Sequence, residues 1–288
     1  MLAINRNELT QFQQKVKNNK LARVISWPVK NLLMKLREFR CFHSHDKKRL
    51  QKFRGKHEGM RCFIIGNGPS LSVSDLEALR GEITFASNRI YRLFDKTDWR
   101  PTYWVASDPG LLTHDREQLL PVTKKRNTTF FITSFCKYFG TEPNIYYFLE
   151  HLKYRIDKFR DYGIGFSEDI TSFMGFGGTV TYIAIQFAIF MGCKEIYLIG
   201  CDHNYSMVFT NGKLVCNNDV KNYPDDMKVG KDELGTAYLD VSTRAYAVAR
   251  EYCEAHGILI ANATRGGKLE VFERVALEDV LKKGMELY

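Results

Sequence analysis

The segment MRCFIIGNGPSL, residues 60–71, decides the fold class of this chain. Four apolar residues at 62–65 run directly into Gly-Asn-Gly-Pro-Ser at 66–70. An apolar run that stops at glycines is typical of a buried strand that ends in a tight loop. In open α/β sheets, ligands bind beyond the carboxyl ends of such strands, so this loop predicts a nucleotide site. The alternative is a structural turn that binds nothing.

The rest of the chain alternates short apolar runs with helical patterns. Strands are predicted at 61–65, 83–86, 102–106, 129–133, 195–199 and 258–261. Helices are predicted at 74–79, 90–95, 113–120, 179–191 and 236–255. This alternation predicts an α/β protein with a Rossmann-like, mainly parallel sheet flanked by helices. Residues 203–235 are polar and irregular for too long to be a simple connection, which is typical of a lid or a partly disordered loop.

Positive charge is concentrated at the N-terminal end of the chain. Residues 1–56 hold fifteen Lys and Arg against three acids, a net charge of +12, and the remainder carries −3. A chain of 288 residues with 44% hydrophobic content can bury a substantial core, which excludes wholesale disorder. We therefore expect a basic helical arm at residues 1–57 and a globular catalytic domain at residues 58–288.

The arm has the pattern of a surface-seeking helix. Apolar residues recur at spacings of three and four, as in Val29, Leu32, Leu33 and Leu36, which predicts one or two amphipathic helices interrupted near Pro28. Such a basic helix fits an anionic membrane surface, where each cation contributes roughly 1 kcal/mol. The alternative is a helix docked on the body with a solvated basic face. Nucleic-acid binding is disfavoured, because the body offers no recognisable nucleic-acid module.

Cysteine usage and hydropathy bear on the compartment. Seven cysteines without CxxC spacing favour a reduced, cytoplasmic protein and argue against a zinc site. The first residues lack the apolar core of a signal peptide, and no stretch reaches the roughly 18 apolar residues of a membrane span. We expect a peripheral protein at the inner membrane face.

The spacing within the glycine loop excludes two familiar nucleotide motifs. An ATPase phosphate loop needs a Lys after its last glycine, and none follows here. A dinucleotide fingerprint needs a small residue where Leu71 stands. Ser74 and Glu77 match a capping box, which predicts a helix beginning after the loop. The side chains of Asn67 and Ser70, and the backbone amides of the two glycines, are then expected to meet a ligand.

Polar clusters follow three other predicted strands, at residues 87–89, 107–110 and 201–205. The carboxyl ends of parallel strands meet at one edge of a sheet, so these clusters are expected to converge with the glycine loop.

Five ordered motifs carry a family resemblance over about residues 60–275. They are GNGPSL, FASNRIY, YWVASDP, GGTVTYIAIQFAIFMGCKEIYLIGCDHNYS and NATRGGKLEVFERV. They resemble the MptE-like 6-hydroxymethylpterin diphosphokinases, a family that includes the related domain of motility-associated flagellin glycosyltransferases. A more distant likeness is to the bacterial lipooligosaccharide sialyltransferases, which share GNGPS and an Asn after the second strand.

The sialyltransferase likeness implies a site for a cytidine monophosphate (CMP) sugar, in which the equivalents of Asn67, Ser70 and Asn88 contact the donor. The predicted donor-binding residues are Gly66, Asn67, Gly68, Pro69, Ser70, Asn88, Arg89, Ser107, Asp108, Gly177, Gly178, Thr179, Asn204, Tyr205, Asn262 and Arg265. The chain also departs from those enzymes. Asn204 stands where they have a Tyr, and residues 204–255 contain no His where their general base lies.

We therefore predict a glycosyltransferase that uses a nucleotide-activated sugar, CMP-linked, to modify a bacterial surface glycan or glycolipid. No metal is obligatory, and a homo-oligomer is possible. The predicted catalytic residues are His203, Asp202 and Asp108. His203 is the first candidate base, because its ordinary pKa lies near operating pH and Asp202 could orient it. Asp108 is the rival base, and Asp225 and Asp226 are weaker rivals.

Two alternatives stay open. A diphosphokinase would transfer pyrophosphate from ATP to a pterin-like alcohol, and it would need Mg²⁺, which Asp108 and Asp202 could hold. A membrane-associated nucleotide-binding protein without enzymatic activity would need no base at all.

Overall fold

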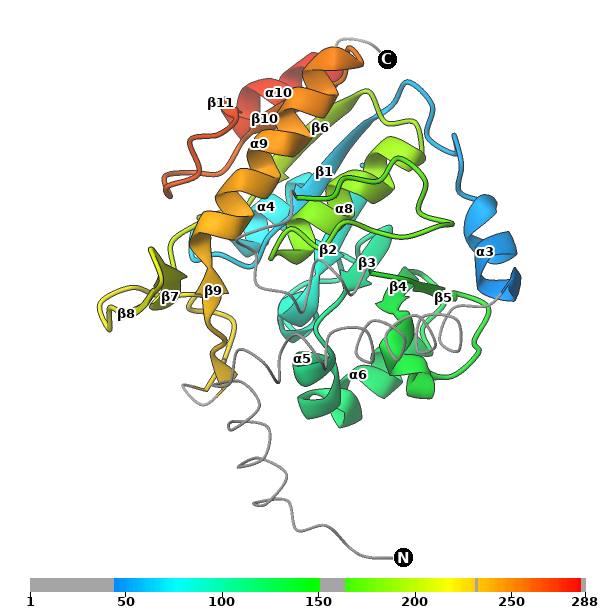
Figure 1. Ribbon diagram of the computed structural model, residues 1–288, viewed down its shortest axis with the longest axis horizontal. Coiled ribbons are helices and arrows are strands. Elements are labelled where there is room, and N and C mark those ends of the chain that lie inside the picture. The colour runs from blue at the N-terminus through cyan, green and yellow to red at the C-terminus, as the bar shows by residue number, and fades with distance from the viewer. Residues whose placement is uncertain (1–43, 151–163, 231–232, 286–288) are drawn as a thin grey trace, which may run out of the picture. The chain divides into compact units, whose positions relative to one another are not determined.

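The computed structural model describes residues 44–150, 164–230 and 233–285. These residues form an α/β unit (Figure 1), so the predicted architecture is confirmed. The expected helices of the arm, including Pro28, lie outside the described residues. Leu50 and Phe53 are buried in the core of the body. Residues 44–57, assigned to the arm by charge, therefore pack as part of the body.

The main sheet has eight strands in the order β11-β10-β6-β1-β2-β3-β4-β5, and every neighbouring pair is parallel. The strands are β1 (Arg61–Ile65), β2 (Thr84–Ser87), β3 (Tyr103–Ala106), β4 (Thr129–Thr133), β5 (Ile145–Phe148), β6 (Glu195–Ile199), β10 (Leu259–Asn262) and β11 (Glu273–Arg274). The chain runs outward from β1 to β5 and then returns to place β6 on the other side of β1. The pair β1 and β6 is therefore the topological switch point.

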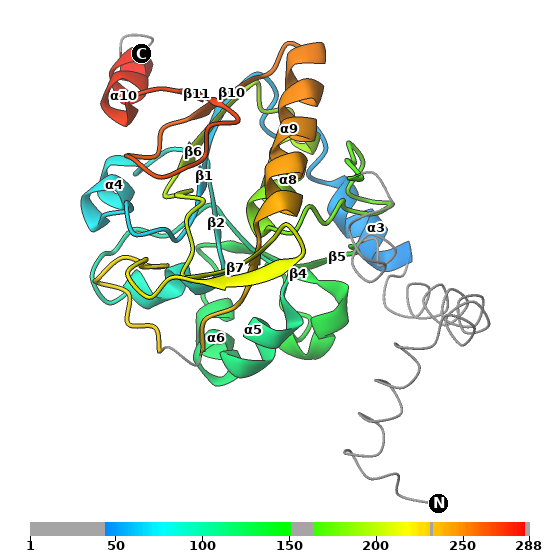
Figure 2. The same ribbon diagram turned by 60° about the vertical axis from the view of Figure 1, so that its left-hand side comes forward.

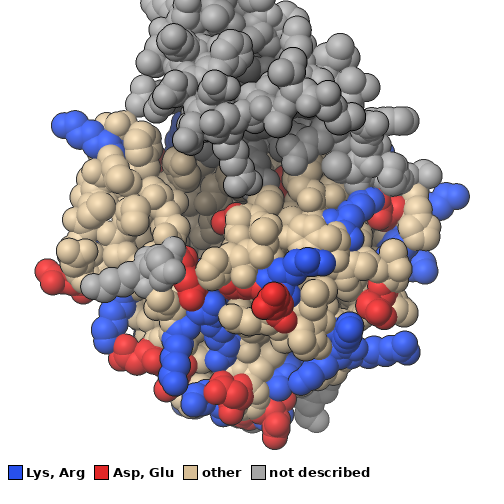
Figure 3. All heavy atoms as spheres, turned by 90° about the horizontal axis from the view of Figure 1, so that it is seen from below, with Lys and Arg blue, Asp and Glu red and all other residues tan. Residues whose placement is uncertain are grey.

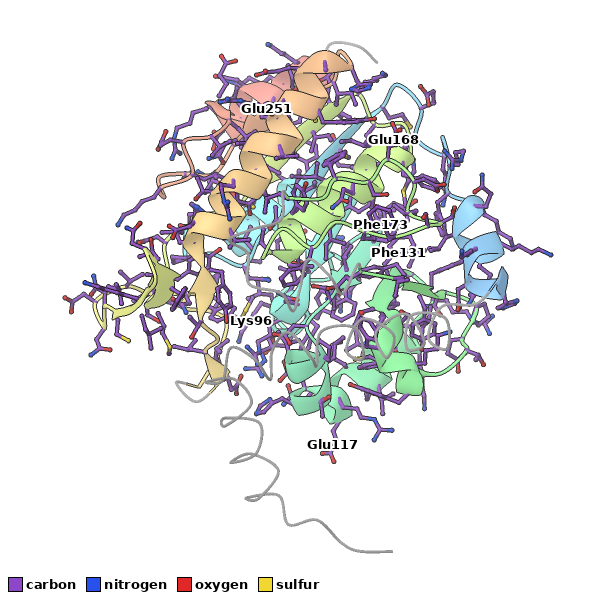
Figure 4. The ribbon with its side chains drawn as sticks, viewed as in Figure 1. Lys96, Glu117, Phe131, Glu168, Phe173 and Glu251 are labelled. Carbon is purple, nitrogen blue, oxygen red and sulfur yellow. The ribbon has the colours of Figure 1, made fainter. Side chains whose placement is uncertain are left out.

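Helices cover both faces of this sheet (Figure 2). One face carries α3 (Ser44–Gln51), α8 (Val180–Phe190) and α9 (Leu239–Ala255), and the other carries α4 (Val73–Ala78) and α10 (Leu277–Met285). Two short helices, α5 (Pro109–His114) and α6 (Arg116–Thr123), follow β3, and 3-10 helices follow β2 (η1, Asn88–Leu93) and β4 (η2, Ser134–Phe139). Helix α8 is almost wholly buried, which explains its apolar sequence. Phe131 of β4, labelled in Figure 4, stacks on Phe187 of α8 at 4.2 Å.

Several predicted boundaries differ from the structure. The capping box is formed by Ser72 and Asp75, not by Ser74 and Glu77, so α4 begins directly after the glycine loop. The helix expected at 113–120 is two helices, because the chain leaves helical geometry at Asp115. The pattern at 90–95 is a 3-10 helix, and the helix expected from 236 begins at Leu239.

Part of the long loop expected at 203–235 is a β-hairpin. Strand β7 (Met207–Thr210) pairs antiparallel with β8 (Lys213–Cys216) and parallel with β9 (Ala237–Tyr238). The turn residues Asn211 and Gly212 both have positive φ, which is the geometry that Asn-Gly hairpin turns require. This dipeptide was the signal in the sequence that would have revealed the hairpin.

The described surface shows no strong segregation of charge on the face drawn in Figure 3, where Lys/Arg and Asp/Glu side chains are interspersed. Among the described helices, none combines the length and the apolar character needed to cross a bilayer.

Candidate functional site

A cavity of about 670 Å³ lies beyond the carboxyl ends of the strands, at the switch point between β1 and β6. Ligands bind at this point in open α/β sheets. Its walls come from the loops after β1, β2, β3 and β6, from the N-terminus of α8, and from a segment around β9. The lining residues lie at 66–68, 87–89, 107–108, 110–111, 114, 176, 178–181, 200–205, 222–223, 233, 235–238, 242 and 246.

The structure brings most of the predicted site residues together in this cavity. They are Gly66, Asn67, Gly68, Asn88, Arg89, Ser107, Asp108, Gly178, Thr179, Asp202, His203, Asn204 and Tyr205. Five others, Pro69, Ser70, Gly177, Asn262 and Arg265, are not among its lining residues. The guanidinium of Arg265 instead pairs with Asp75 at 2.6 Å and with Glu278 at 2.7 Å. Asn262 is buried and donates to the carbonyl of Leu269 at 2.8 Å.

The glycine loop is bound tightly to the loop after β6. The amide of Gly66 donates to the carbonyl of Ile199 and the amide of Gly68 donates to that of Gly200, each at 2.8 Å. The expectation that these two amides face a ligand is therefore wrong, because both are already used between the loops. Glycine is required here because the two backbones lie too close together for a side chain.

Asp202 joins the same two loops. Its carboxylate accepts the hydroxyl of Ser70 at 2.7 Å and the amide of Ser70 at 3.3 Å. Burial raises the pKa of Asp202, and the two bonds from Ser70 oppose that effect. Ser70 was predicted to contact a ligand, but its hydroxyl and amide bond to Asp202 and so connect the two loops. Asp202 was expected to orient His203, but its carboxylate bonds to Ser70 instead, so that prediction is wrong.

Three uncharged polar atoms on the walls of the cavity have no hydrogen-bond partner among the described residues. They are Oδ1 of Asn67, Oδ1 of Asn88 and Nδ1 of His203. The three residues come from the loops after three neighbouring strands, β1, β2 and β6. Buried polar atoms normally have partners, so three such acceptors in one cavity point to a ligand that donates hydrogen bonds.

Each asparagine has a hydrogen bond to a neighbouring residue that fixes its position in the cavity wall. The Asn67 amide group donates to the carbonyl of Ser87 at 2.9 Å, and the indole of Trp104 donates to the carbonyl of Asn88 at 3.0 Å. Asn88 and His203 also have positive φ, 49° and 52°. Residues other than glycine rarely adopt positive φ, although Asn and His do so more often than most, and such strained conformations concentrate at functional sites.

His203 is a neutral imidazole with one free nitrogen. Its Nε2 lies 2.8 Å from the hydroxyl of Thr243, which itself donates to the carbonyl of Leu239. Because the single hydroxyl proton of Thr243 is used, Nε2 carries the imidazole proton and Nδ1 keeps its lone pair. Burial lowers the pKa of His203 to about 4, so the ring is neutral at physiological pH.

Acidification is therefore expected to destabilise the protein through His203. Its folded pKa lies below the ordinary value of 6.5, so the stabilisation is complete above pH 6.5 and is lost as the pH falls towards 4. A shift of this size corresponds to about 3 kcal/mol. Urea unfolding at pH 7 and pH 4.5 should show a smaller loss for His203→Gln than for the parent, whereas the exposed His256→Gln should behave as the parent. Equal losses in the parent and in His203→Gln would contradict this account.

A buried charge cluster forms the wall between α5 and the segment around residue 233. Arg89 donates through Nε to Asp115 at 2.9 Å and lies 3.5 Å from Glu233. Arg92 pairs with Glu233 at 2.7 Å, and Arg89 also donates to the hydroxyl of Tyr223 at 3.3 Å. Arg89 was predicted to contact the donor sugar nucleotide, but its guanidinium already pairs with Asp115 and Glu233.

The sequence reasoning missed several residues of this wall, namely His114, Asp115, Tyr223 and Glu233. None of them directly follows a strand, so the search for polar clusters at strand ends could not find them. The adjacent pair His114-Asp115 was the available signal, since neighbouring acidic and imidazole groups are frequent in active sites.

Solved structures of similar fold include a MAf glycosyltransferase and a sialyltransferase. A MAf glycosyltransferase from Magnetospirillum magneticum AMB-1 is 12% identical with a TM-score of 0.48, and the match covers 85% of this chain but only 41% of that one. The sialyltransferase CstII from Campylobacter jejuni with cytidine-5'-monophosphate is 18% identical with a TM-score of 0.46, covering 76% and 86% of the two chains. Its structure with CMP-3FNeuAc is 16% identical, with a TM-score of 0.45 and coverages of 75% and 86%.

No curated protein sequence matches the chain. The family model for the MptE-like 6-hydroxymethylpterin diphosphokinases matches residues 30–208, which is more than half of it. That span contains the glycine loop, the two loops that follow β2 and β3, and the loop after β6. The chain therefore belongs to the MptE-like 6-hydroxymethylpterin diphosphokinase family.

Proposed function

We propose that this chain is a glycosyltransferase whose cavity binds a nucleotide-activated sugar, and that the nucleotide is CMP. The observation that carries the proposal is the convergence of three unpartnered acceptors, on Asn67, Asn88 and His203, in one cavity. Cytidine, ribose and sugar groups are rich in N–H and O–H donors that match such acceptors. The motif likeness of residues 66–70 and of Asn88 to sialyltransferases favours the same donor class.

The charges of the cavity favour a ligand with few phosphates. Among its described lining residues Arg89 is the one Lys or Arg, and it already pairs with Asp115 and Glu233. Three carboxylates, Asp108, Asp202 and Glu233, line the same space. A triphosphate would meet carboxylates without a free cation, whereas the single phosphate of a CMP-sugar carries one negative charge.

Neutral donors remain for that single phosphate. The N-terminus of α8, with its cap Thr179 and the preceding Gly178, lines the cavity together with Thr181. The first amides of a helix and its dipole favour an anion, and hydroxyls at the same place add further donors. Stabilising the departing phosphate is the main electrostatic task in such a transfer.

The reaction that gives the family its description would need Mg²⁺, and the described residues do not fit that ion. No group of three His, Cys, Asp or Glu side chains in the described parts of the chain is arranged to hold a metal. Of the two carboxylates expected to do so, Asp202 is bonded to Ser70 and Asp108 caps α5 through Oδ1, which accepts from Gly110 at 2.8 Å. We therefore derive no step through a metal.

Nucleotide-induced thermal shift tests this proposal. CMP is expected to raise the melting temperature of the full chain without Mg²⁺, and Asn67→Ala and Asn88→Ala should each weaken the binding of CMP about tenfold, since each removes a buried polar partner. Asn217→Ala, on the exposed surface, is the matched control. A shift with ATP and Mg²⁺ but none with cytidine nucleotides would overturn the transferase in favour of the diphosphokinase. CMP binding without nucleotide release from any sugar donor would favour the non-enzymatic alternative.

A further inference from the structure

A second histidine, not singled out by any sequence pattern, lies on the wall of the cavity. His114 is the last residue of α5, and its side chain is 52% exposed. Its Nδ1 lies 2.6 Å from Oδ1 of Asp115. It shares the cavity with Asp108, Asn67 and His203. An accessible imidazole beside a carboxylate in a ligand cavity is a candidate for proton transfer.

The carboxylate of Asp115 is ionised and rigidly held. It is fully buried, and its Oδ2 accepts Nε of Arg89 and the hydroxyl of Tyr91, each at 2.9 Å. Burial alone would raise the pKa of Asp115, but the hydrogen bonds from His114, Arg89 and Tyr91 hold it below its ordinary value. An ionised carboxylate only accepts hydrogen bonds, so Nδ1 of His114 carries the proton and Nε2 keeps its lone pair.

The two histidines of the cavity are thus suited to different tasks. His203 is buried, is bonded through Nε2 to Thr243, and gains a proton only near pH 4. His114 is accessible, and the negative charge of Asp115 stabilises the imidazolium that forms when Nε2 takes a proton. A general base needs access to the reacting hydroxyl and a partner for its charged form, and His114 has both.

We propose that His114, oriented by Asp115, is the general base for the acceptor hydroxyl. This inference rests on the proposed glycosyl transfer. The acceptor oxygen forms a bond to the anomeric carbon while the bond from that carbon to the phosphate oxygen breaks. The acceptor proton passes to Nε2 of His114, and the electron pair of the broken bond leaves with CMP. In this arrangement Nδ1 of His203 accepts a hydrogen bond from the bound CMP-sugar.

Several charged groups surround the pair. They are Arg89, Tyr91 and Arg92 from η1, Asp115 from the start of α6, Glu233 from the segment before β9, and Asp108 and His203 on the cavity walls. The Arg and carboxylate charges within the buried cluster offset one another.

The test compares His114→Gln with the parent enzyme and with His45→Gln, an exposed histidine on α3. The probes are a panel of CMP-, UDP- and GDP-linked sugars, with release of free nucleotide to water or to added sugar acceptors as the readout. His114→Gln is expected to lower kcat on the active donor about 100-fold or more, with KM and the CMP thermal shift little changed.

The possible results distinguish the role of His114 from the glycosyl transfer itself. A parent enzyme that turns over a donor, with His114→Gln equally fast, overturns the role of His114 alone. A loss of CMP binding in His114→Gln overturns it too, because a base that acts on the acceptor does not hold the donor. If the parent enzyme releases nucleotide from no sugar nucleotide in the panel, the proposed glycosyl transfer is overturned, and the role of His114 is overturned with it.

Discussion

Replacing Gly66 with alanine is expected to prevent the native packing of the loops after β1 and β6. A Cβ atom at this position would overlap the carbonyl oxygen of Gly200 and lie 2.8 Å from its carbon, and Sγ of Cys201 would be 3.1 Å away. The obstacle is backbone, and both loops are tied by the hydrogen bonds of Gly66 and Gly68, so neither can shift alone. Overpacking of this kind costs several kcal/mol, and the variant should lose CMP binding together with most of its stability.

Urea unfolding and CMP titration would measure this effect. The matched control is Gly235→Ala, because Gly235 lines the same cavity but an added Cβ would meet no atom within 4 Å. This control should unfold at the parent's urea concentration. A Gly66→Ala variant with the parent's stability would show that the glycine serves something other than the close approach of the two loops.

Replacing Asp115 with alanine is expected to cost about 3–5 kcal/mol of unfolding free energy, because it leaves a buried arginine without its main partner. Asp115 is fully buried and Arg89 is 3% exposed. The hydroxyl of Tyr91 also loses one of its two acceptors, the other being Gln118 at 3.0 Å. Glu233, 3.5 Å from Arg89, compensates only in part, since the optimal geometry belongs to Asp115.

Urea or thermal unfolding at pH 7 would measure this loss, with Asp225→Ala as the control. Asp225 pairs with Lys221 at 2.7 Å, but both side chains are largely exposed, so the control should unfold as the parent does. The pKa of Asp115 lies below its ordinary value of 3.8, so its contribution is present above that value and is lost as the pH falls through the folded pKa. The parent and Asp115→Ala should therefore converge in stability at acid pH. Equal stabilities at pH 7 would contradict a structural role for the pair.

The strands of the sheet were largely readable from local pattern. The predicted runs 61–65, 129–133 and 195–199 coincide with β1, β4 and β6, because buried parallel strands are continuous apolar runs bounded by polar residues. Strand β5 was missed although its β-branched and aromatic residues follow Pro143 and Asn144, the kind of boundary that marks a strand. The small sheet around β7 was missed because β7 is largely half-buried, β8 is exposed throughout, and neither shows the alternation that marks a strand with one buried face.

About half of the residues of the candidate site could be predicted from the sequence, because they follow the ends of predicted strands. Asn67, Asn88, Asp108 and His203 stand just beyond the ends of parallel strands, and parallel strands end on the same edge of a sheet. Arg265 follows β10 in the same way but lies outside the cavity, because Asp75 and Glu278 hold its guanidinium elsewhere. Position at a strand end therefore predicts the edge of the sheet but not the direction in which a side chain points.

The sequence by itself determined the α/β class, the meeting of several polar clusters at one edge of the sheet and the charge asymmetry of the chain, since each follows from local composition and the geometry of parallel strands. Only the tertiary structure decided which polar groups remain available to a ligand. The amides of Gly66 and Gly68, the hydroxyl of Ser70 and the guanidinium of Arg89 are used by partners that are often distant in the chain, up to 144 residues away for Arg89. Contacts in space decide which groups a hydrogen-bond donor meets, and no local sequence pattern records those contacts.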